Sequence, residues 1–366
     1  MKIGILTFHR AINYGAVLQC YALYTTLKTM GHDVEVIDYR PESIEKYRMF
    51  FRKKDFFNTD GITKKIRYIV SSLFLINSKK RTNEKFDSFI TDRMKLSRTV
   101  KNVHDIPNYY DVVFFGSDQI WNPQTCEGLD PVYWGQFKKN HAILVTYAAS
   151  LGRLDLLSPE DINNIRDFVK IYNRVSVREM DLKIFMEKEY GLQTELVCDP
   201  TILLNSDYYI QIMEKPKYDN YLLLYTVEPD LEAEQFAHNI AQQIHCEVIR
   251  LYAYLSPIKT QRLTYDSELS PYSFLGYIAQ AKCVITNSFH ATSFSIIFNK
   301  DFYYLSQISN SRADSLMTSL GITNRLVKSD KSIKFTHVDY SNIETRIKVY
   351  RKKSINFLIS TLRNDD

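Results

Sequence analysis

The chain has 366 residues, of which 45% are hydrophobic and 24% are charged, and its net charge at pH 7 is +5. This length exceeds what a single core usually serves, so two domains are expected, and the composition excludes a disordered chain. The basic excess is small and concentrated in one segment, which argues against a nucleic-acid partner.

The N-terminus carries no signal-peptide pattern, and no apolar run approaches the roughly 18 residues of a membrane-spanning helix. The five cysteines form no C-x-x-C pair, which is typical of reduced thiols in a cytosolic protein. We therefore expect a cytoplasmic protein. The sequence has no cluster of metal ligands, so no metal site is predicted.

The N-terminal segment has the pattern of a β-α-β unit. Residues 2–7 predict a buried strand, 15–30 an amphipathic helix and 33–37 a second strand. The first turn, F-H-R-A-I-N-Y-G, lacks the G-x-G-x-x-G pattern, so dinucleotide binding is not predicted. It still places His9 and Asn13 at the carboxyl end of a strand, where open α/β sheets bind ligands.

From residue 41 to about residue 101 the sequence predicts a basic helical insertion around the apolar run 68–76. The basic residues that surround this run include Arg48, Arg52, Lys53, Lys54, Lys64, Lys65, Arg67, Lys79, Lys80 and Arg81. A basic helix with one apolar face can lie at an anionic membrane surface, so residues 48–81 are a candidate for peripheral contact with the inner membrane. The alternative is a solvated insertion whose apolar face packs on its own domain.

A predicted strand at 111–115 is followed by the loop G-S-D-Q-I-W-N-P. Asp118 and Gln119 supply hydrogen-bonding groups for sugar hydroxyls, and Trp121 offers an aromatic face for the ring. The loop is therefore a candidate saccharide-binding loop. The alternative is an ordinary capping loop, because the same residues favour turns.

Two further candidates follow strands in this half of the chain. Arg178 comes after a predicted strand at 174–177 and suits a bidentate grip on a carboxylate or phosphate. The alternative for Arg178 is a surface salt bridge. Asp199 lies at the end of another strand, where Pro200 stops regular structure.

A second α/β half begins after residues 201–220. Strands are expected at 221–225, 247–251, 283–286 and 302–305, and helices at 231–244, 271–281, 311–321 and 341–362. The whole pattern predicts an α/β protein with two lobes, residues 1–205 and 206–340, followed by a C-terminal helix at 341–366.

The strand at 283–286 turns into a helix at 287–290. A helix N-terminus at the end of a strand attracts anions, because free N–H groups and the helix dipole point there. His290 stands beside this position and can carry a proton near neutral pH. The alternative is a histidine packed under a loop.

Seven motifs carry a family resemblance over residues 13–322. They are N-Y-G-A-V-L-Q-C-Y-A-L, G-S-D-Q-I-W-N-P, Y-A-A-S-L-G, V-S-V-R-E, C-D-P-T-I-L-L, N-S-F-H-A-T-S-F-S-I-I-F and S-R-A-D-S-L-M-T-S-L-G-I. In this order they resemble the polysaccharide pyruvyl transferase family. The resemblance implies two Rossmann-like lobes arranged as in GT-B glycosyltransferases, with a cleft between them. It also implies transfer of a pyruvyl group from phosphoenolpyruvate to a sugar as a ketal, in bacterial surface polysaccharide biosynthesis.

The resemblance places Arg178 and the His290 motif at the phosphoenolpyruvate site, and the loop around Asp118 toward the cleft. Many members have an arginine where this chain has Ser288, and an acidic residue where it has Ala16. Arg312 or a lysine is then a candidate to neutralise the donor in its place. The predicted donor-binding residues are Arg178, Ser288, Arg312 and Asn13.

This chemistry asks for an acid and a base, but for no metal and no cofactor besides the co-substrate. His290 is the predicted acid, and His9, Asp118 or Asp199 could supply the base. The predicted acceptor-binding residues are Trp121, Gln119 and Asp199, and the acceptor is expected to be a lipid-linked or polysaccharide-repeat saccharide. Two alternatives stay open: a GT-B glycosyltransferase that uses a nucleotide sugar, and a non-catalytic saccharide-binding member of the family.

Overall fold

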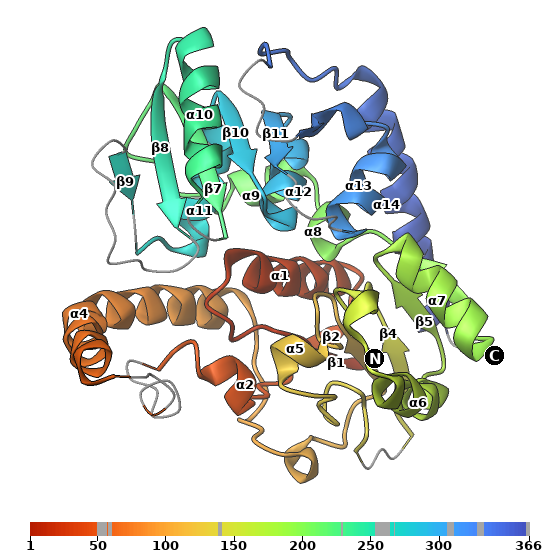
Figure 1. Ribbon diagram of the computed structural model, residues 1–366. Coiled ribbons are helices and arrows are strands. Elements are labelled where there is room, and N and C mark those ends of the chain that lie inside the picture. The colour runs from red at the N-terminus through yellow and green to blue at the C-terminus, as the bar shows by residue number, and fades with distance from the viewer. Residues whose placement is uncertain are drawn as a thin grey trace.

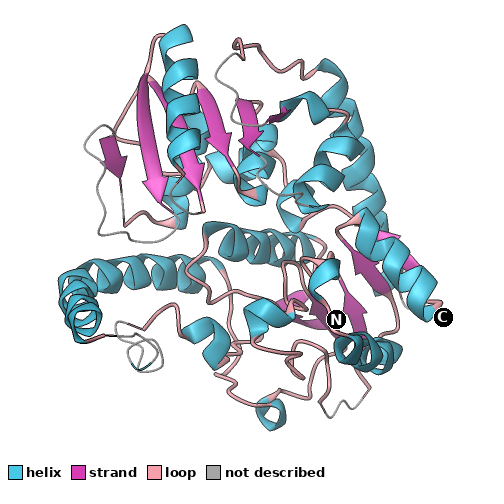
Figure 2. Cartoon of the chain, viewed as in Figure 1, coloured by secondary structure: helices cyan, strands magenta, loops and turns pink. Residues whose placement is uncertain are grey.

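The computed structural model describes residues 1–49, 57, 61–137, 141–227, 230–252, 264–266, 268–305, 311–327 and 333–363. The basic residues at 52–54, part of the predicted membrane-contacting segment, lie outside the described residues. The described chain forms two lobes, each built on a parallel sheet (Figure 1). Helices surround the strands in both lobes (Figure 2).

The N-terminal lobe is organised on four parallel strands in the order β2-β1-β3-β4. They are β1 (Lys2–Leu6), β2 (Asp33–Val36), β3 (Val112–Phe115) and β4 (Ile143–Thr146). A parallel pair, β5 (Val175–Val177) and β6 (Thr194–Leu196), continues this sheet through a bridge between Val145 and Arg174. The strands are short apolar runs, which is typical of a parallel sheet buried on both faces.

The helices of this lobe are α1 (Tyr14–Thr29), α2 (Glu42–Glu45), α4 (Ile62–Arg93), α5 (Pro123–Cys126), α6 (Pro159–Phe168), α7 (Met180–Tyr190) and α8 (Pro200–Leu203). Short 3-10 turns span Val103–Asp105, Leu154–Leu156 and Val169–Ile171. Capping side chains fix the first residue of several of these helices. Asn13 caps α1, and Ser158 and Asp161 form a capping box on α6.

The C-terminal lobe contains six parallel strands in the order β12-β11-β10-β7-β8-β9. They are β7 (Tyr221–Thr226), β8 (Glu247–Tyr252), β9 (Thr264–Asp266), β10 (Cys283–Thr286), β11 (Asp301–Leu305) and β12 (Leu326–Val327). Its helices are α9 (Ser206–Ile210), α10 (Leu231–Gln243), α11 (Pro271–Gln280), α12 (Phe289–Ile297) and α13 (Ser311–Leu320), with a 3-10 turn at Thr323–Arg325.

The last helix, α14 (Ser341–Leu362), runs from the C-terminal lobe back to the N-terminal lobe (Figure 1). Near its end, Arg174 donates from Nη1 to the Ser360 hydroxyl at 2.6 Å. Further back, the Cys198 N–H donates to the Ser354 hydroxyl at 2.8 Å. These contacts hold the end of the N-terminal sheet to a helix that starts in the other lobe.

The helix α4 also connects the two lobes. Its last turns bury Phe86, Phe89 and Ile90 against α1 and α11. In its middle, Arg81 donates from Nε to a carboxylate oxygen of Glu268 at 2.6 Å. Its first turns expose apolar side chains instead.

The predicted fold class is confirmed: this is an α/β protein with two Rossmann-like lobes, each a parallel sheet flanked by helices. The predicted helix at 341–362 and the predicted strand at 283–286 have those same bounds. Within the described residues, no helix combines the length and the apolar character needed to cross a membrane.

Candidate active site

The site is built around the turn between β10 and α12. The hydroxyl of Ser288 caps α12 by accepting a hydrogen bond from the Ala291 N–H at 3.4 Å. His290 is the second residue of the helix, and only 6% of its surface is exposed. The predicted strand-to-helix turn is therefore confirmed, with the imidazole enclosed by protein.

The imidazole of His290 lies directly against the first turn of α1, which belongs to the other lobe. A Cβ atom at Gly15 would lie 2.1 Å from His290 Nδ1 and 2.2 Å from its Cγ. Every residue except glycine would therefore displace the ring or the helix. Next to Gly15, the Tyr14 ring stacks on Phe274 of α11 with 4.5 Å between centroids. The two lobes thus meet at the site itself.

Asp199 lies at the centre of the buried polar groups. Its Oδ1 caps α8 by accepting from the Thr201 N–H at 3.0 Å and from the Thr201 hydroxyl at 2.7 Å. Its Oδ2 accepts from Arg178 Nη1 at 2.6 Å and from the Ser117 hydroxyl at 3.2 Å. The same oxygen lies 3.6 Å from His290 Nε2.

Burial alone would raise the pKa of Asp199, but His290 and Arg178 outweigh it and hold the pKa well below its usual range. Asp199 is therefore a carboxylate at every physiological pH. Its negative charge faces the imidazole of His290 and the guanidinium of Arg178 and orients both.

Arg178 follows β5 and has 3% of its surface exposed. Burial lowers its pKa, but Glu179, Asp199 and Asp118 together raise it, and the guanidinium stays charged. Nε donates to Glu179 at 3.0 Å and Nη1 donates to Asp199. Nη2 has no hydrogen-bond partner among the described residues, although Asp118 Oδ1 lies 3.7 Å away.

A second arginine extends the site toward solvent. Arg312, at the start of α13, lies 4.0 Å from Asp118 Oδ1, and 22% of its side chain is exposed. Burial and the neighbouring Arg178 lower its pKa. The ring of Phe289 lies near both guanidinium groups, at 4.6 Å from Arg178 and 5.9 Å from Arg312. Both cations are within reach of the ring face, which favours positive charge.

Three carboxylates accompany these two arginines and His290. They are Asp118, Asp199 and Glu179, and burial raises the pKa of Glu179, while Arg178 offsets part of the effect. An anionic ligand that bound here would meet fixed positive charge at two arginines. The carboxylates meanwhile keep the ligand-free site near neutrality. The arrangement is chemically suited to an anionic ligand beside the imidazole of His290.

The structure brings together most of the residues predicted for the site. His290, Arg178, Asp118, Asp199 and Arg312 lie within one network of contacts. Two other predicted donor-binding residues, Ser288 and Asn13, are caps of the helices that meet there, α12 and α1.

Three predicted roles need correction. Trp121 is 1% exposed, and its ring stacks on Trp134 at 4.5 Å, so its face is not open to a sugar. His9 is fully buried and its Nε2 lies 2.9 Å from Asp38 Oδ1, so we assign this pair a structural role instead of a catalytic one. Asp199 is enclosed by Arg178 and its other partners, so it orients side chains instead of contacting an acceptor.

The remaining acceptor-binding prediction, Gln119, lies half-buried in the loop after β3. Its Oε1 accepts from Asn122 Nδ2 at 3.4 Å. A Cβ atom at Gly152 would lie 2.8 Å from Gln119 Nε2, so the two loops pack closely. Gln119 stays a candidate for acceptor binding.

Four contributors to the site were not predicted: Gly15, Ser117, Glu179 and Phe289. Each is adjacent in sequence to a residue of a motif already identified, or lies within one. Their roles depend on contacts between distant segments, which a single sequence does not reveal. Within the described residues, no three His, Cys, Asp or Glu side chains are placed to hold a metal ion.

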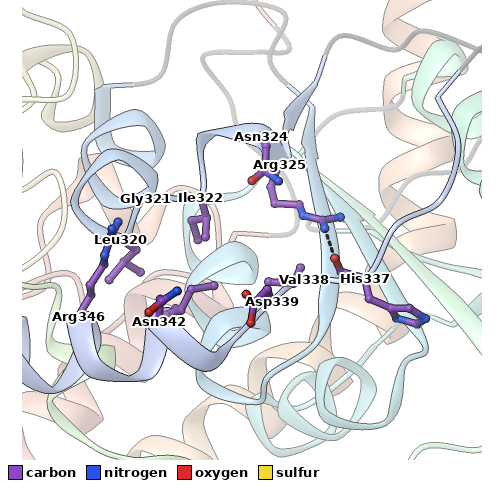
Figure 3. Close-up of a pocket in the computed structure, with 11 residues that line it drawn as sticks. Leu320, Gly321, Ile322, Asn324, Arg325, His337, Val338, Asp339, Asn342 and Arg346 are labelled. Atoms are coloured by element: carbon purple, nitrogen blue, oxygen red, sulfur yellow. Dashed lines mark hydrogen bonds between the residues drawn. The ribbon is translucent and has the colours of Figure 1, made fainter.

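A separate pocket of about 250 Å³ lies between α13 and the start of α14 (Figure 3). Arg346, Asn342 and Arg325 are among its lining residues, and Arg325 donates to the backbone carbonyl oxygens of Thr336 and His337 at 2.8 and 2.5 Å. The pocket shares no lining residue with the network around His290.

Solved structures similar to this chain include two UDP-GlcNAc 2-epimerases. The enzyme from Neisseria meningitidis, bound to UDP-GlcNAc, has a TM-score of 0.48 and 11% identity, covering 97% of this chain and 94% of its own. The enzyme from Methanocaldococcus jannaschii has a TM-score of 0.45 and 12% identity, covering 96% and 93%. No curated protein matches the sequence.

The sequence model that matches this chain is that of polysaccharide pyruvyl transferase, over residues 13–309. This range includes the first turn of α1 at Gly15, the Arg178 strand end and the His290 turn, which the structure places together. The chain belongs to the polysaccharide pyruvyl transferase family.

Proposed function

We propose that this protein transfers the pyruvyl group of phosphoenolpyruvate to two hydroxyl groups of a saccharide, forming a cyclic ketal and releasing phosphate. The acceptor is a lipid-linked saccharide of bacterial surface polysaccharide biosynthesis. The observation that carries the proposal is Arg178 Nη2, a buried, charged donor without a hydrogen-bond partner in the described chain, close to His290 and Arg312. Buried donors are rarely left unpaired unless a ligand completes them.

Phosphoenolpyruvate supplies the kind of group that this donor lacks. Its carboxylate is planar and its phosphate is tetrahedral, and the oxygens of both groups accept hydrogen bonds from guanidinium groups. In the proposed complex, Arg178 binds one of these groups through Nη2, and Arg312, which is partly exposed, binds the other. Ser288, the cap of α12, carries no charge, and Arg312 would supply the second positive charge that the donor needs.

His290 is the proposed acid. Its Nδ1 is packed against Gly15 of α1, whereas Nε2 lies 3.6 Å from the Asp199 carboxylate and has no hydrogen-bond partner within the described residues, so Nε2 is the nitrogen that would deliver the proton. Asp199 thereby acts as a positioning residue, because it is buried away from the substrate.

The proposed reaction has three steps. His290 Nε2 gives its proton to the methylene carbon, forming a C–H bond, and a sugar hydroxyl attacks C2 while Asp118 takes the hydroxyl proton. The C2–O bond to phosphate then breaks, and a second hydroxyl attacks the resulting cation. Its proton leaves with the phosphate, and the proton held by Asp118 returns to His290 through solvent, so one donor and one diol give one ketal and one hydrogen phosphate.

Asp118 is the proposed base for the hydroxyls. It follows β3 and adopts a left-handed backbone conformation, with φ at 69°. Aspartate tolerates this region better than most residues, and the turn directs its carboxylate toward both arginines, at 3.7 and 4.0 Å. Gln119, the next residue, would bind the same acceptor.

Phosphate release from phosphoenolpyruvate tests this proposal, with the protein alone and with a panel of diol-containing saccharides. We expect release that depends on a saccharide and equals the amount of ketal formed. The increase in melting temperature with phosphoenolpyruvate, compared with that with UDP-GlcNAc, reports which ligand binds. Stabilisation by the nucleotide sugar alone, or no saccharide-dependent release, would contradict pyruvyl transfer.

A further inference from the structure

The first turns of α4 expose a continuous apolar stripe on the surface. Ile62, Ile66 and Leu73 have 76%, 56% and 63% of their surface exposed. Ile69 and Val70 lie between them and are also exposed. The spacing of three and four residues places all five side chains on one face of the helix. A stripe about 17 Å long therefore faces solvent.

The charge of this part of α4 is of one sign. Between positions 62 and 83 the sequence has six lysines and arginines and no aspartate or glutamate. Lys64 is exposed near one end of the stripe. Lys80, whose Nζ lies 3.9 Å from an exposed Glu84 carboxylate, is exposed near the other end, on the same face as Leu73. An apolar stripe with exposed cations at its ends is typical of a helix that lies in the interface of an anionic membrane.

The rest of the helix fixes this stripe to the body of the protein. Arg81 and Ser78 both donate to the Glu268 carboxylate, and Lys85 donates to the Glu268 carbonyl oxygen at 2.6 Å. Beyond them, Phe86 contacts the ring of Tyr14 at 5.2 Å between centroids. Tyr14 precedes Gly15, which contacts His290. In Figure 1, α4 extends to the left from this junction of the lobes.

We infer that the first half of α4 docks on an anionic lipid surface, with the stripe Ile62, Ile66, Ile69, Val70 and Leu73 inserted among the acyl chains. A second copy of the chain is a poorer occupant, because pairing two such helices brings together segments that carry only positive charge. A phosphate-rich nucleic acid would leave the apolar stripe in water.

Docking would hold the junction of the lobes, and with it the His290 site, beside the membrane. The molecule that the site would meet at the membrane is a lipid-linked saccharide, and this part of the inference rests on the proposed function. The contact with lipid does not, because it requires neither donor nor acceptor. An experiment can therefore disprove the membrane contact without disproving pyruvyl transfer, and the reverse.

Co-sedimentation of the full chain with vesicles tests the inference. We expect binding to vesicles of equal parts phosphatidylcholine and phosphatidylglycerol, weaker binding to phosphatidylcholine alone, and loss of binding in high salt. The double variant Ile66→Ser, Leu73→Ser should bind the mixed vesicles at least about tenfold more weakly, because each buried CH₂ contributes about fourfold. Lys64→Gln with Lys80→Gln should weaken binding by about 25-fold, about fivefold for each lysine.

Two exposed apolar residues elsewhere provide the matched control. Leu231→Ser with Val349→Ser removes similar exposed surface from α10 and α14 and should leave vesicle binding unchanged. All variants should release phosphate from phosphoenolpyruvate with a soluble saccharide as the wild type does. Wild-type protein that stays in solution with the mixed vesicles, or a stripe variant that binds them as tightly as the wild type, would overturn the inference. So would a dimer that dissociates when the stripe is replaced.

Discussion

Arg178 is the residue on which donor binding depends most in the proposed site. Two of its guanidinium nitrogens are already bonded to Glu179 and Asp199, so the group is held rigidly, with Nη2 left to bind a ligand. Lysine keeps the positive charge but cannot make these bonds and reach the ligand together, because it has one nitrogen.

We therefore expect Arg178→Lys to lower kcat/KM for phosphoenolpyruvate, with a loss of about 2 to 4 kcal/mol of transition-state stabilisation. Arg174→Lys is the matched control, because Arg174 lies just before β5 and binds Glu195 and Ser360, outside the site. A folded Arg178→Lys protein with wild-type donor kinetics would place Arg178 outside the donor site.

The buried charge of Asp199 should make the free energy of unfolding depend on pH. Its pKa is lower in the folded protein than the usual value of 3.8, so its ionised form stabilises the fold above about pH 4. This contribution is lost progressively as the pH falls toward the folded-state pKa. An asparagine at this position cannot ionise, so Arg178 would lose one of the carboxylates that balance its charge.

Asp199→Asn should lower the free energy of unfolding by about 3 to 5 kcal/mol at neutral pH, as for other broken buried ion pairs. Urea denaturation at several pH values should show this difference constant above about pH 5 and shrinking below about pH 4. The exposed Asp92→Asn serves as control and should change little. A difference that grows on acidification would mean that Asp199 is not ionised in the folded protein.

At the scale of elements, the contact between α1 and α12 is the feature that joins the lobes at the site. Gly15 is required because the His290 ring occupies the position of its Cβ. In solvent-exposed helices alanine is more stable than glycine by about 1 kcal/mol, so steric conflict with His290 is the one reason to expect the opposite result here.

We expect Gly15→Ala to lower both the melting temperature and turnover in the wild-type background. In a His290→Ala background, where the ring is absent, the same substitution should be neutral or stabilising. The double-mutant cycle measured by urea denaturation isolates this coupling. Equal effects in the two backgrounds would show that the ring does not lie against Gly15 in solution.

Most elements of the fold could be predicted because their signals are local. Cys283–Thr286 is an apolar run with polar residues after it, and Ser341–Leu362 has helical periodicity throughout. The site was predicted in part for a similar reason: Arg178, Asp199 and His290 each follow a strand, and parallel strands present their carboxyl ends along one edge.

The incorrect predictions concern side chains whose partners are distant in sequence. His9 follows β1, and the parallel pairing of β1 with β2 brings Asp38 within 2.9 Å of it. Trp121 occurs in a polar loop, but the chain turns inward and Trp134 covers its ring. Both outcomes depend on packing between segments, which hydrophobic periodicity does not encode.

For the whole molecule, we propose that the two lobes together form one proton-transfer site. Gly15, Arg178 and Asp199 precede the second lobe in the chain, while His290 and Arg312 belong to it. Each lobe alone would lack either the acid or the groups that orient it. Catalysis should therefore require both lobes in the arrangement that Figure 1 shows.

The most direct test is ketal formation by His290→Gln, followed by the NMR signal of the ketal methyl group, with donor affinity measured separately by calorimetry. Glutamine keeps much of the shape of the ring but cannot deliver the proton, so turnover should fall by about 10²- to 10⁴-fold while phosphoenolpyruvate still binds. His104→Gln, at an exposed position, should behave as the wild type. Near-normal ketal formation by a folded His290→Gln protein, or a loss explained entirely by weaker donor binding, would contradict the account.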